Sequence, residues 1–224
     1  MCGVAVLLLS SATYGGAGVD VSALTSDQAA GGLREALTRG ITTSVAETGR
    51  PGGFEKNPLI KIMMPEKLRG VEKALRAMGM GGQVDNFVHS MNVAAEEAAP
   101  RAKAIFMDAL KAMTIEDAKG IVLGGNTAGT EFFKRKTSTQ VSDAFRPVIE
   151  KAMAHTGVQE KFTSLMGSAP KLPFGRSPTL DINGYVLQKS VDGMFTMMGE
   201  EEKKIRTNPA SQVTPLLKMV FGRK

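Results

Sequence analysis

Apolar residues recur every three to four positions from Leu33 to Phe221, and this spacing restricts what the chain can fold into. Such a period places apolar side chains along one face of an α-helix, whereas a half-buried strand needs alternation with period 2. Almost no segment of this chain alternates. Helices with one apolar face bury it against one another, so the sequence predicts an all-α protein, an irregular bundle of about eight to ten helices.

Capping residues, glycines and prolines predict where the helices begin and end. Thr25-Ser-Asp-Gln28 has the capping-box spacing and predicts a first helix over residues 25–48. Pro65 suits the first turn of a second helix. The apolar face of that second helix would hold Leu68, Val71, Leu75 and Met78.

Further boundaries follow along the chain. Pro100 is expected to kink or end a helix that starts near Gln83. Thr114 suits the N-cap of a short helix that Gly124-Gly125 ends. Thr137-Ser-Thr-Gln140 repeats the capping-box spacing and predicts another helix start. Later boundaries are predicted at Thr127, Gly157, Thr179 or Asp181, Asn208-Pro209 and Pro215.

The N-terminus resembles a secretory signal peptide, because residues 4–9 are apolar and small residues follow them. Only Met1, Cys2 and Gly3 precede this run, so the usual basic region is missing. Residues 1–18 are therefore interpreted as an atypical signal peptide or an apolar tail. Residues 19–224 are predicted to form a single helical domain with a Pro/Gly-rich internal loop at 167–178. We expect a periplasmic or secreted protein.

The composition excludes several kinds of site. One Cys and two His are too few for zinc sites of three His, four Cys or two of each, and we predict no metal and no cofactor. The net charge of +6 permits attraction to nucleic acid or to an anionic membrane surface. Acidic residues are interleaved with the basic ones and Trp is absent, so nucleic-acid binding is not favoured and membrane-surface binding is only weakly supported.

One polar stripe is a candidate for a ligand pocket. Asp85, His89, Asn92 and Glu96 lie at i, i+4, i+7 and i+11, which places them on one side of a helix. A solvated helix face is the simplest explanation of this spacing. A di-metal carboxylate site would need Glu-x-x-His twice, and that pattern does not occur.

The loop Gly124-Gly-Asn-Thr-Ala-Gly-Thr130 is a second candidate, with Asn126, Thr127 and Thr130 as pocket residues. Small residues before a helix can bind anions through backbone N–H groups. A phosphate loop also needs a preceding strand and a Gly-Lys-Ser/Thr ending, and both are missing. A helix break followed by a new cap explains the same residues.

Methionines and the segment 200–206 have simpler explanations than ligand binding. Most of the 14 methionines are in phase with Leu and Val, which favours core filling over an adaptable groove or a Cu(I) site. In Glu200-Glu-Glu-Lys-Lys-Ile-Arg206, acids and bases are paired at i,i+3 and i,i+4. Such pairs are sufficient to stabilise an exposed helix end.

Several motifs in order resemble the domain-of-unknown-function 4197 (DUF4197) family over about residues 24–222. They are Ser90-Met-Asn-Val-Ala-Ala-Glu96, Met113-Thr-Ile-Glu-Asp-Ala-Lys119 leading to Gly124-Gly-Asn-Thr-Ala128, Asp192-Gly-Met-Phe195 and Glu201-Glu-Lys-Lys-Ile-Arg-Thr-Asn-Pro209. The resemblance implies a protein exported by Gram-negative bacteria. It implies no catalytic residue.

From these observations we predict a non-enzymatic binding or interaction module that takes a partner protein or an apolar small molecule between helices. One alternative is an enzyme that uses Glu96, Glu97, Glu131 or Asp192, with or without a divalent metal. Another is a structural protein of the envelope surface. A pocket, if present, should be bordered by residues 85–96 and 124–133.

Overall fold

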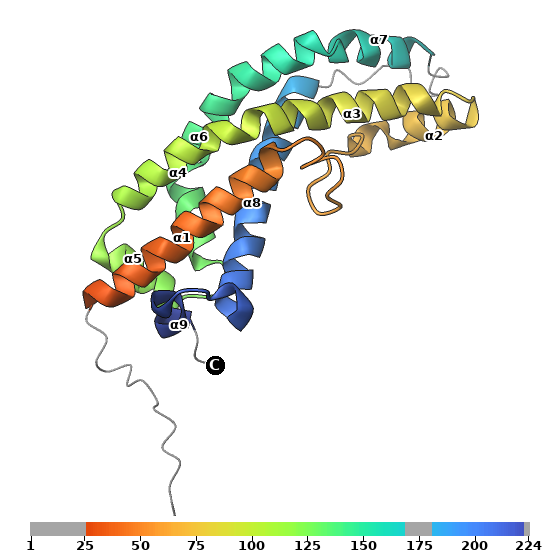
Figure 1. The fold of residues 1–224 in the computed structure, drawn as a ribbon. Coiled ribbons are helices and arrows are strands. Elements are labelled where there is room, and N and C mark those ends of the chain that lie inside the picture. The colour runs from red at the N-terminus through yellow and green to blue at the C-terminus, as the bar shows by residue number, and fades with distance from the viewer. Residues whose placement is uncertain (1–25, 169–180, 222–224) are drawn as a thin grey trace, which may run out of the picture.

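The computed structural model describes residues 26–168 and 181–221, and within them the regular structure is entirely helical (Figure 1). The all-α class is therefore confirmed. Residues 1–18, which were interpreted as a signal peptide or apolar tail, the Thr25 cap and most of the loop predicted at 167–178 lie outside the described residues. Among the described helices, none is long and apolar enough to span a bilayer.

The elements keep the labels of Figure 1. The helices are α1 (Ser26–Gly49), η2 (Glu66–Leu68), α2 (Arg69–Ala77), α3 (Gly81–Ala98), η3 (Ala99–Arg101), α4 (Ala102–Lys111), α5 (Ile115–Leu123), α6 (Ala128–His155), α7 (Val158–Ser168), α8 (Ile182–Thr207), η4 (Pro209–Ser211) and α9 (Pro215–Phe221), where η marks a 3₁₀ turn.

As predicted, α3 ends at Ala98, just before Pro100, but no gap follows it. Pro100 lies in the 3₁₀ turn η3, which follows α3 directly and leads directly into α4. Proline has no N–H to donate, and a tighter turn accommodates it at the junction. The three elements form one long rod (Figure 1), so α3 and α4 are joined end to end without a loop between them.

α6 is one continuous helix, and the second helix start predicted at Thr137-Ser-Thr-Gln140 is wrong. Thr137 is buried, and its hydroxyl donates to the carbonyl of Phe133, one turn earlier. A threonine on the buried face thus satisfies its hydroxyl within the helix instead of capping a new one. Pro147 lies inside α6.

Other boundaries match the prediction. Thr114 and Asp117 form a capping box at the start of α5. Gly157 follows α6 with φ of 63°, a conformation that glycine adopts without strain. Asp181 caps α8 by accepting from the N–H of Gly184. Met78 is a correction, because it is 57% exposed rather than on the buried face of α2.

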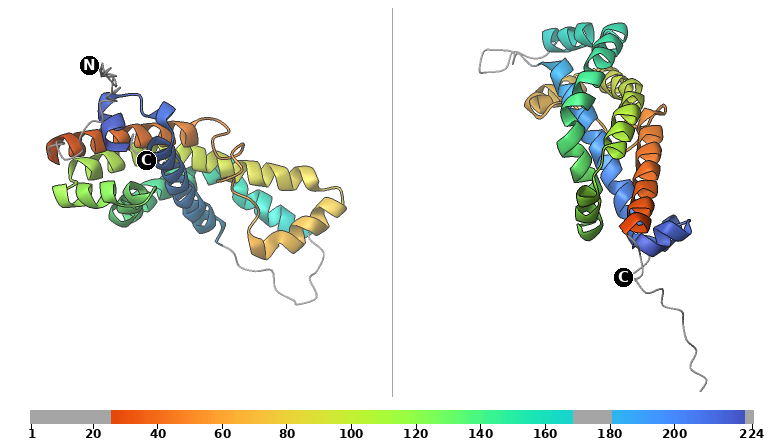
Figure 2. Two further views of the ribbon diagram at one scale, coloured as in Figure 1. Left: turned by 90° about the horizontal axis from the view of Figure 1, so that it is seen from below. Right: turned by 90° about the vertical axis from the view of Figure 1, so that its left-hand side faces the viewer.

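The core is built around α8, which packs against both α1 and α6, while the α3–α4 rod packs against α6 and α1 (Figures 1 and 2). Phe106 of α4 lies at its centre, with ring centroids 5.9 Å from Phe133 of α6 and 5.6 Å from Phe195 of α8. As predicted, the apolar positions of α1 are buried; they are Leu33, Leu37, Ile41 and Val45.

Gly193 allows α8 to approach the segment between α1 and α2 closely. A methyl group at Gly193 would lie 2.6 Å from Cε1 of Phe54, whose ring is fully buried, and 3.3 Å from Cβ of Ile60. Contacts this short require either the ring or the helix to move. The glycine thereby fixes the distance between α8 and residues 54–60.

Replacing Gly193 with alanine should therefore lower the free energy of unfolding by about 1–2 kcal/mol, because overpacking outweighs the gain in helix propensity. The control is Gly120→Ala in α5, where a methyl group meets no atom within 4 Å. That control should raise stability by about 0.5–1 kcal/mol. Urea unfolding of both variants measures the difference, and equal shifts would contradict the close approach at Gly193.

Candidate functional site

The polar stripe of α3 divides into an exposed half and a buried half. Asp85 and His89 are exposed, whereas Asn92 is fully buried and Glu96 is 7% exposed. The interpretation of the whole stripe as a solvated face is therefore wrong for its second half. Both buried side chains bind the main chain of the segment that joins α1 to α2.

Asn92 binds Ile62 as a neighbouring strand would. Its Oδ1 accepts from the N–H of Ile62 at 2.8 Å, and its Nδ2 donates to the carbonyl of Ile62 at 2.9 Å. The same nitrogen donates to the carbonyl of Val88 at 2.8 Å. A buried stretch without helix or strand must satisfy its backbone groups by other means, and Asn92 does so here.

Glu96 holds the turn after α1. Its carboxylate accepts from the N–H groups of Gly52, Phe54 and Glu55 at 2.9, 3.0 and 3.1 Å. Three backbone donors satisfy a buried carboxylate well, so this glutamate is engaged in structure. Glu96 and Asn92 together fix the course of the chain from α1 to residue 62.

The exposed half of the stripe makes surface ion pairs. Asp85 accepts from Nη2 of Arg76 at 2.7 Å, and this hydrogen bond holds the pKa of the Asp85 carboxyl below its usual value. Nδ1 of His89 lies 2.8 Å from Oε2 of Glu55. Exposed pairs of this kind contribute at most about 1 kcal/mol each.

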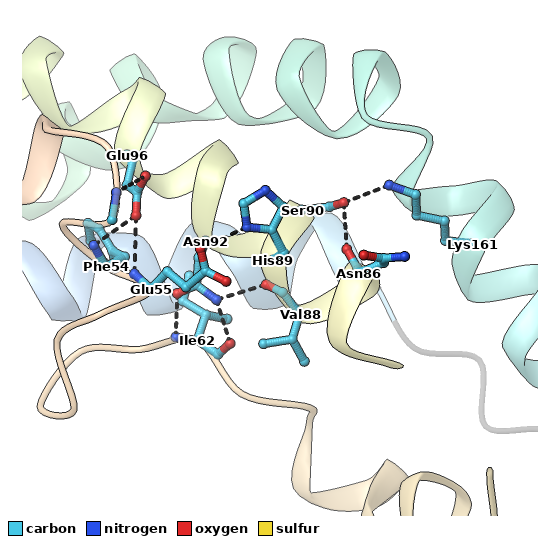
Figure 3. Close-up of polar contacts among 11 residues, drawn as sticks. Phe54, Glu55, Ile62, Asn86, Val88, His89, Ser90, Asn92, Glu96 and Lys161 are labelled. Carbon is cyan, nitrogen blue, oxygen red and sulfur yellow. Dashed lines mark hydrogen bonds and ion pairs between the residues drawn. The ribbon is translucent and has the colours of Figure 1, made fainter. Parts of the chain in front are cut away.

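Ser90 and Lys161 form a contact that could suggest a nucleophile and its base. Lys161 Nζ donates to Oγ of Ser90 at 2.8 Å, and the hydroxyl donates to the carbonyl of Asn86. Ser90 is only 2% exposed, so the geometry gives a substrate no access to the hydroxyl. The contact ties α7 to α3 (Figure 3).

The loop candidates at 126–130 lead to a buried ion pair. Asn126 and Thr127 are exposed, and Thr127 makes no side-chain cap at the start of α6. The carboxylate of Glu202 on α8 takes that role, since it accepts from the N–H groups of Gly129 at 2.8 Å and Thr130 at 2.7 Å. The hydroxyl of Thr130 donates to the same carboxylate at 2.7 Å.

Arg206 completes this cluster. Its Nε donates to Glu202 at 2.9 Å, and its Nη2 donates to the carbonyl of Ile121 at the end of α5. Both side chains are 8% exposed, so segment 200–206 is not simply the exposed helix end that its charge pattern predicted. The ring of Phe221 on α9 lies 4.9 Å from the guanidinium carbon. One ion pair thus joins α5, α6, α8 and α9.

A small apolar cavity lies beside this cluster, with a volume of about 20 Å³. Thr130 and Phe133 border it together with α1 and α8, so the predicted segment 124–133 does line a cavity. The space holds about one water molecule and is too small for a ligand.

The carboxylates proposed for an enzyme are dispersed. Glu96 is bound to backbone N–H groups, Glu97 and Asp192 line two different hollows, and Glu131 is exposed in the first turn of α6. Within residues 26–168 and 181–221, no group of three or more His, Cys, Asp or Glu is placed to hold a metal ion.

A groove of about 510 Å³ lies between residues 59–69 and the first half of α8; we call it the α8 groove. Tyr185, Lys189, Asp192, Gly193 and Thr196 line its α8 side. Ile60 and Met64 are buried beneath it, whereas Leu59 and Met63 are 65% and 52% exposed. The groove thus combines apolar side chains with a charged rim, as small-molecule sites do.

Tyr185 fixes the two sides of the α8 groove relative to each other. Its hydroxyl donates to the carbonyl of Met63 at 3.0 Å. Burial raises the pKa of the Tyr185 hydroxyl above its usual value, and the nearby Glu66 carboxylate adds to this rise. The hydroxyl therefore keeps its proton and this hydrogen bond at neutral pH.

Sequence reasoning missed the α8 groove as a site. Of its residues, Asp192 was considered as a catalytic carboxylate, and Met63 and Met64 were assigned with the other methionines to core filling rather than to a groove. A third, more open hollow of about 880 Å³ is lined by Glu97 and His155, among others. Residues 85–96, which were expected to border a pocket, line none of these three spaces. The available signal was the mixture of apolar and basic residues at 59–69, a segment that contains the proline-initiated turn η2.

The family model described as "Protein of unknown function (DUF4197)" matches residues 23–222. The chain belongs to this family, which confirms the resemblance found in the motifs. No curated protein and no solved structure matches the chain.

Proposed function

We propose that the protein is a non-enzymatic binding module and that its α8 groove takes a small apolar molecule. The observation that supports this proposal most strongly is the pair of exposed apolar side chains, Leu59 and Met63, which line a groove of about 510 Å³. A groove of this volume is in the range of small-ligand sites, about 300–1,000 Å³.

The rigidity of the groove walls supports this proposal. Residues 59–65 have no regular structure, yet Asn92 holds Ile62 on one side and Tyr185 holds Met63 on the other. Gly193 brings α8 against Ile60 at the far end. A preformed site loses little conformational entropy when it binds a ligand. Contact with the exposed apolar side chains of this site therefore contributes more of its free energy to affinity.

Size argues for a small molecule rather than a partner protein. A stable protein interface buries about 800 Å² on each partner, far more than two exposed apolar side chains supply. The α8 groove instead has two walls that can enclose a narrow ligand. The remaining large exposed apolar residues among the described ones do not line it; they are Met78, Ile115, Leu123 and Val213.

The test is a titration of the full chain with N-phenyl-1-naphthylamine, a neutral apolar dye whose fluorescence rises on transfer from water. We expect saturable binding, and Met63→Ser should weaken it about fivefold, because about 1 kcal/mol of apolar contact is lost. Met78→Ser is the matched control, since Met78 is similarly exposed and does not line the groove. Absence of saturable binding, or equal loss in both variants, would contradict the proposal.

A further inference from the structure

The charges around the α8 groove are unevenly distributed. Four basic residues and two acidic residues line it. One acid, Glu66, is paired with Arg69. Within the described part of the chain no ion pair neutralises Lys67 or Lys189, so the groove carries excess positive charge. The basic residues are Lys61, Lys67, Arg69 and Lys189.

Lys67, Arg69 and Lys189 lie toward the Tyr185 end of the groove, whereas Lys61 adjoins Ile60 and acts electrostatically on Asp85 of α3. Glu66 and Arg69 both act electrostatically on the Tyr185 hydroxyl, which places η2 and the start of α2 beside Tyr185. Lys189 follows Tyr185 by one helical turn, and its Nζ lies 5.9 Å from the centre of the Tyr185 ring. This contact holds one lysine against the groove wall.

The other end of the groove is apolar with one acid. Gly193 lies against Phe54 and Ile60, and Leu59 and Asp192 line the same region. At 1.5 Å per residue, Tyr185 and Gly193 are about 12 Å apart along α8. Met63, whose carbonyl accepts from the Tyr185 hydroxyl, lies toward the basic end and is half exposed. The groove therefore has a basic end near Tyr185 and a largely apolar end with one acid near Gly193.

We infer that the ligand of the α8 groove is a single-chain anionic amphiphile, with its charged head at Lys67 and Lys189 and its apolar tail along Met63 and Leu59. This inference rests on the proposed function. An anionic head beside two lysines gains attraction, whereas a cationic head would be repelled there. The volume of about 510 Å³ fits one dissolved amphiphile rather than a bilayer surface.

The test compares three probes with similar tails, namely decanoate, decanol and decyltrimethylammonium, as competitors of N-phenyl-1-naphthylamine on the full chain. Decanoate should bind about fivefold to tenfold more tightly than decanol, and decyltrimethylammonium should bind most weakly. Added salt should reduce the difference in affinity between decanoate and decanol, because salt screens the charge of exposed lysines.

Variants locate the head. The double variant Lys67→Gln, Lys189→Gln should lower the affinity for decanoate about fivefold to tenfold and leave that for decanol unchanged. Both lysines are exposed, so their replacement should not disturb folding. Lys218→Gln is the control, because this exposed lysine lies on α9 and outside the groove.

The outcomes separate this inference from the proposed function. If decanol and decanoate bind equally, the anionic class is wrong while the apolar groove stands. If no probe displaces the dye and the dye itself does not bind, the proposed function fails. A third outcome would contradict the inference: the protein binds anionic vesicles, and dissolved decanoate does not inhibit that binding. The lysines would then be assigned to a membrane surface.

Discussion

Replacing Glu202 with alanine should lower the free energy of unfolding by about 3–5 kcal/mol. The substitution leaves the buried Arg206 without its carboxylate partner. It also leaves the N–H groups of Gly129 and Thr130 without an acceptor in the protein interior. Breaking one half of a buried ion pair has effects of this size. Urea unfolding followed by circular dichroism measures the change.

The matched control is Glu201→Ala, one residue earlier on α8. Glu201 is 16% exposed and pairs with the exposed Lys204 at 3.5 Å, so its loss should change stability by about 1 kcal/mol or less. The double variant Glu202→Leu, Arg206→Met should recover part of the stability, because it removes both buried charges. Similar losses at positions 201 and 202 would contradict the role of the buried pair.

Replacing Asn92 with leucine should lower the free energy of unfolding by about 2–4 kcal/mol. Leucine has a similar size but leaves the N–H and the carbonyl of Ile62 without partners in the interior, and each unsatisfied group costs about 1–3 kcal/mol. Urea unfolding measures this effect. Asn86→Leu, at an exposed position of the same helix, is the control and should change stability by about 0.5 kcal/mol or less.

The Asn92 variant also tests whether the segment it holds forms the groove. With Ile62 released, residues 59–65 should lose their fixed position against α8. We expect the Asn92→Leu protein, at a temperature where it remains folded, to bind N-phenyl-1-naphthylamine at least fivefold more weakly. Unchanged dye binding together with lowered stability would show that Asn92 supports the fold but not the groove.

Helix boundaries were predictable where a local signal decides them. The capping box at Thr114, the glycine at position 157 and the N-cap at Asp181 act within a few residues of themselves. The helix start predicted at Thr137 was wrong for a physical reason. A capping-box spacing on a buried helix face caps nothing when the hydroxyl donates to a carbonyl of the preceding turn. Local spacing cannot reveal which face a neighbouring helix will cover.

The burial of polar residues was partly readable from the helical phase. On α3, Val84, Val88, Asn92 and Glu96 follow one another at intervals of four, so the two polar residues continue an apolar stripe. On α8, Glu202 continues the stripe of Met194 and Met198 in the same way. A polar residue in apolar phase indicates a buried partner, and the partners here are backbone groups 30 to 73 residues away.

The α8 groove could not be predicted, because it depends on contacts distant in sequence. The hydrogen bond between Tyr185 and Met63 spans 122 residues, and no local pattern encodes it. An irregular segment such as 59–65 has no periodicity from which to infer its exposed face. Only the packing of α8 against it shows that Leu59 and Met63 line a common hollow.

The most direct test of the binding site is nuclear magnetic resonance of the full chain with ¹³C-labelled methionine methyl groups, titrated with N-phenyl-1-naphthylamine. Met63 and Met78 are 52% and 57% exposed, so both report on ligand contact with similar access. We predict saturable shifts of the Met63 methyl signal and none of the Met78 signal. An unchanged Met63 signal, or equal shifts of both, would contradict the assignment of the α8 groove as the binding site.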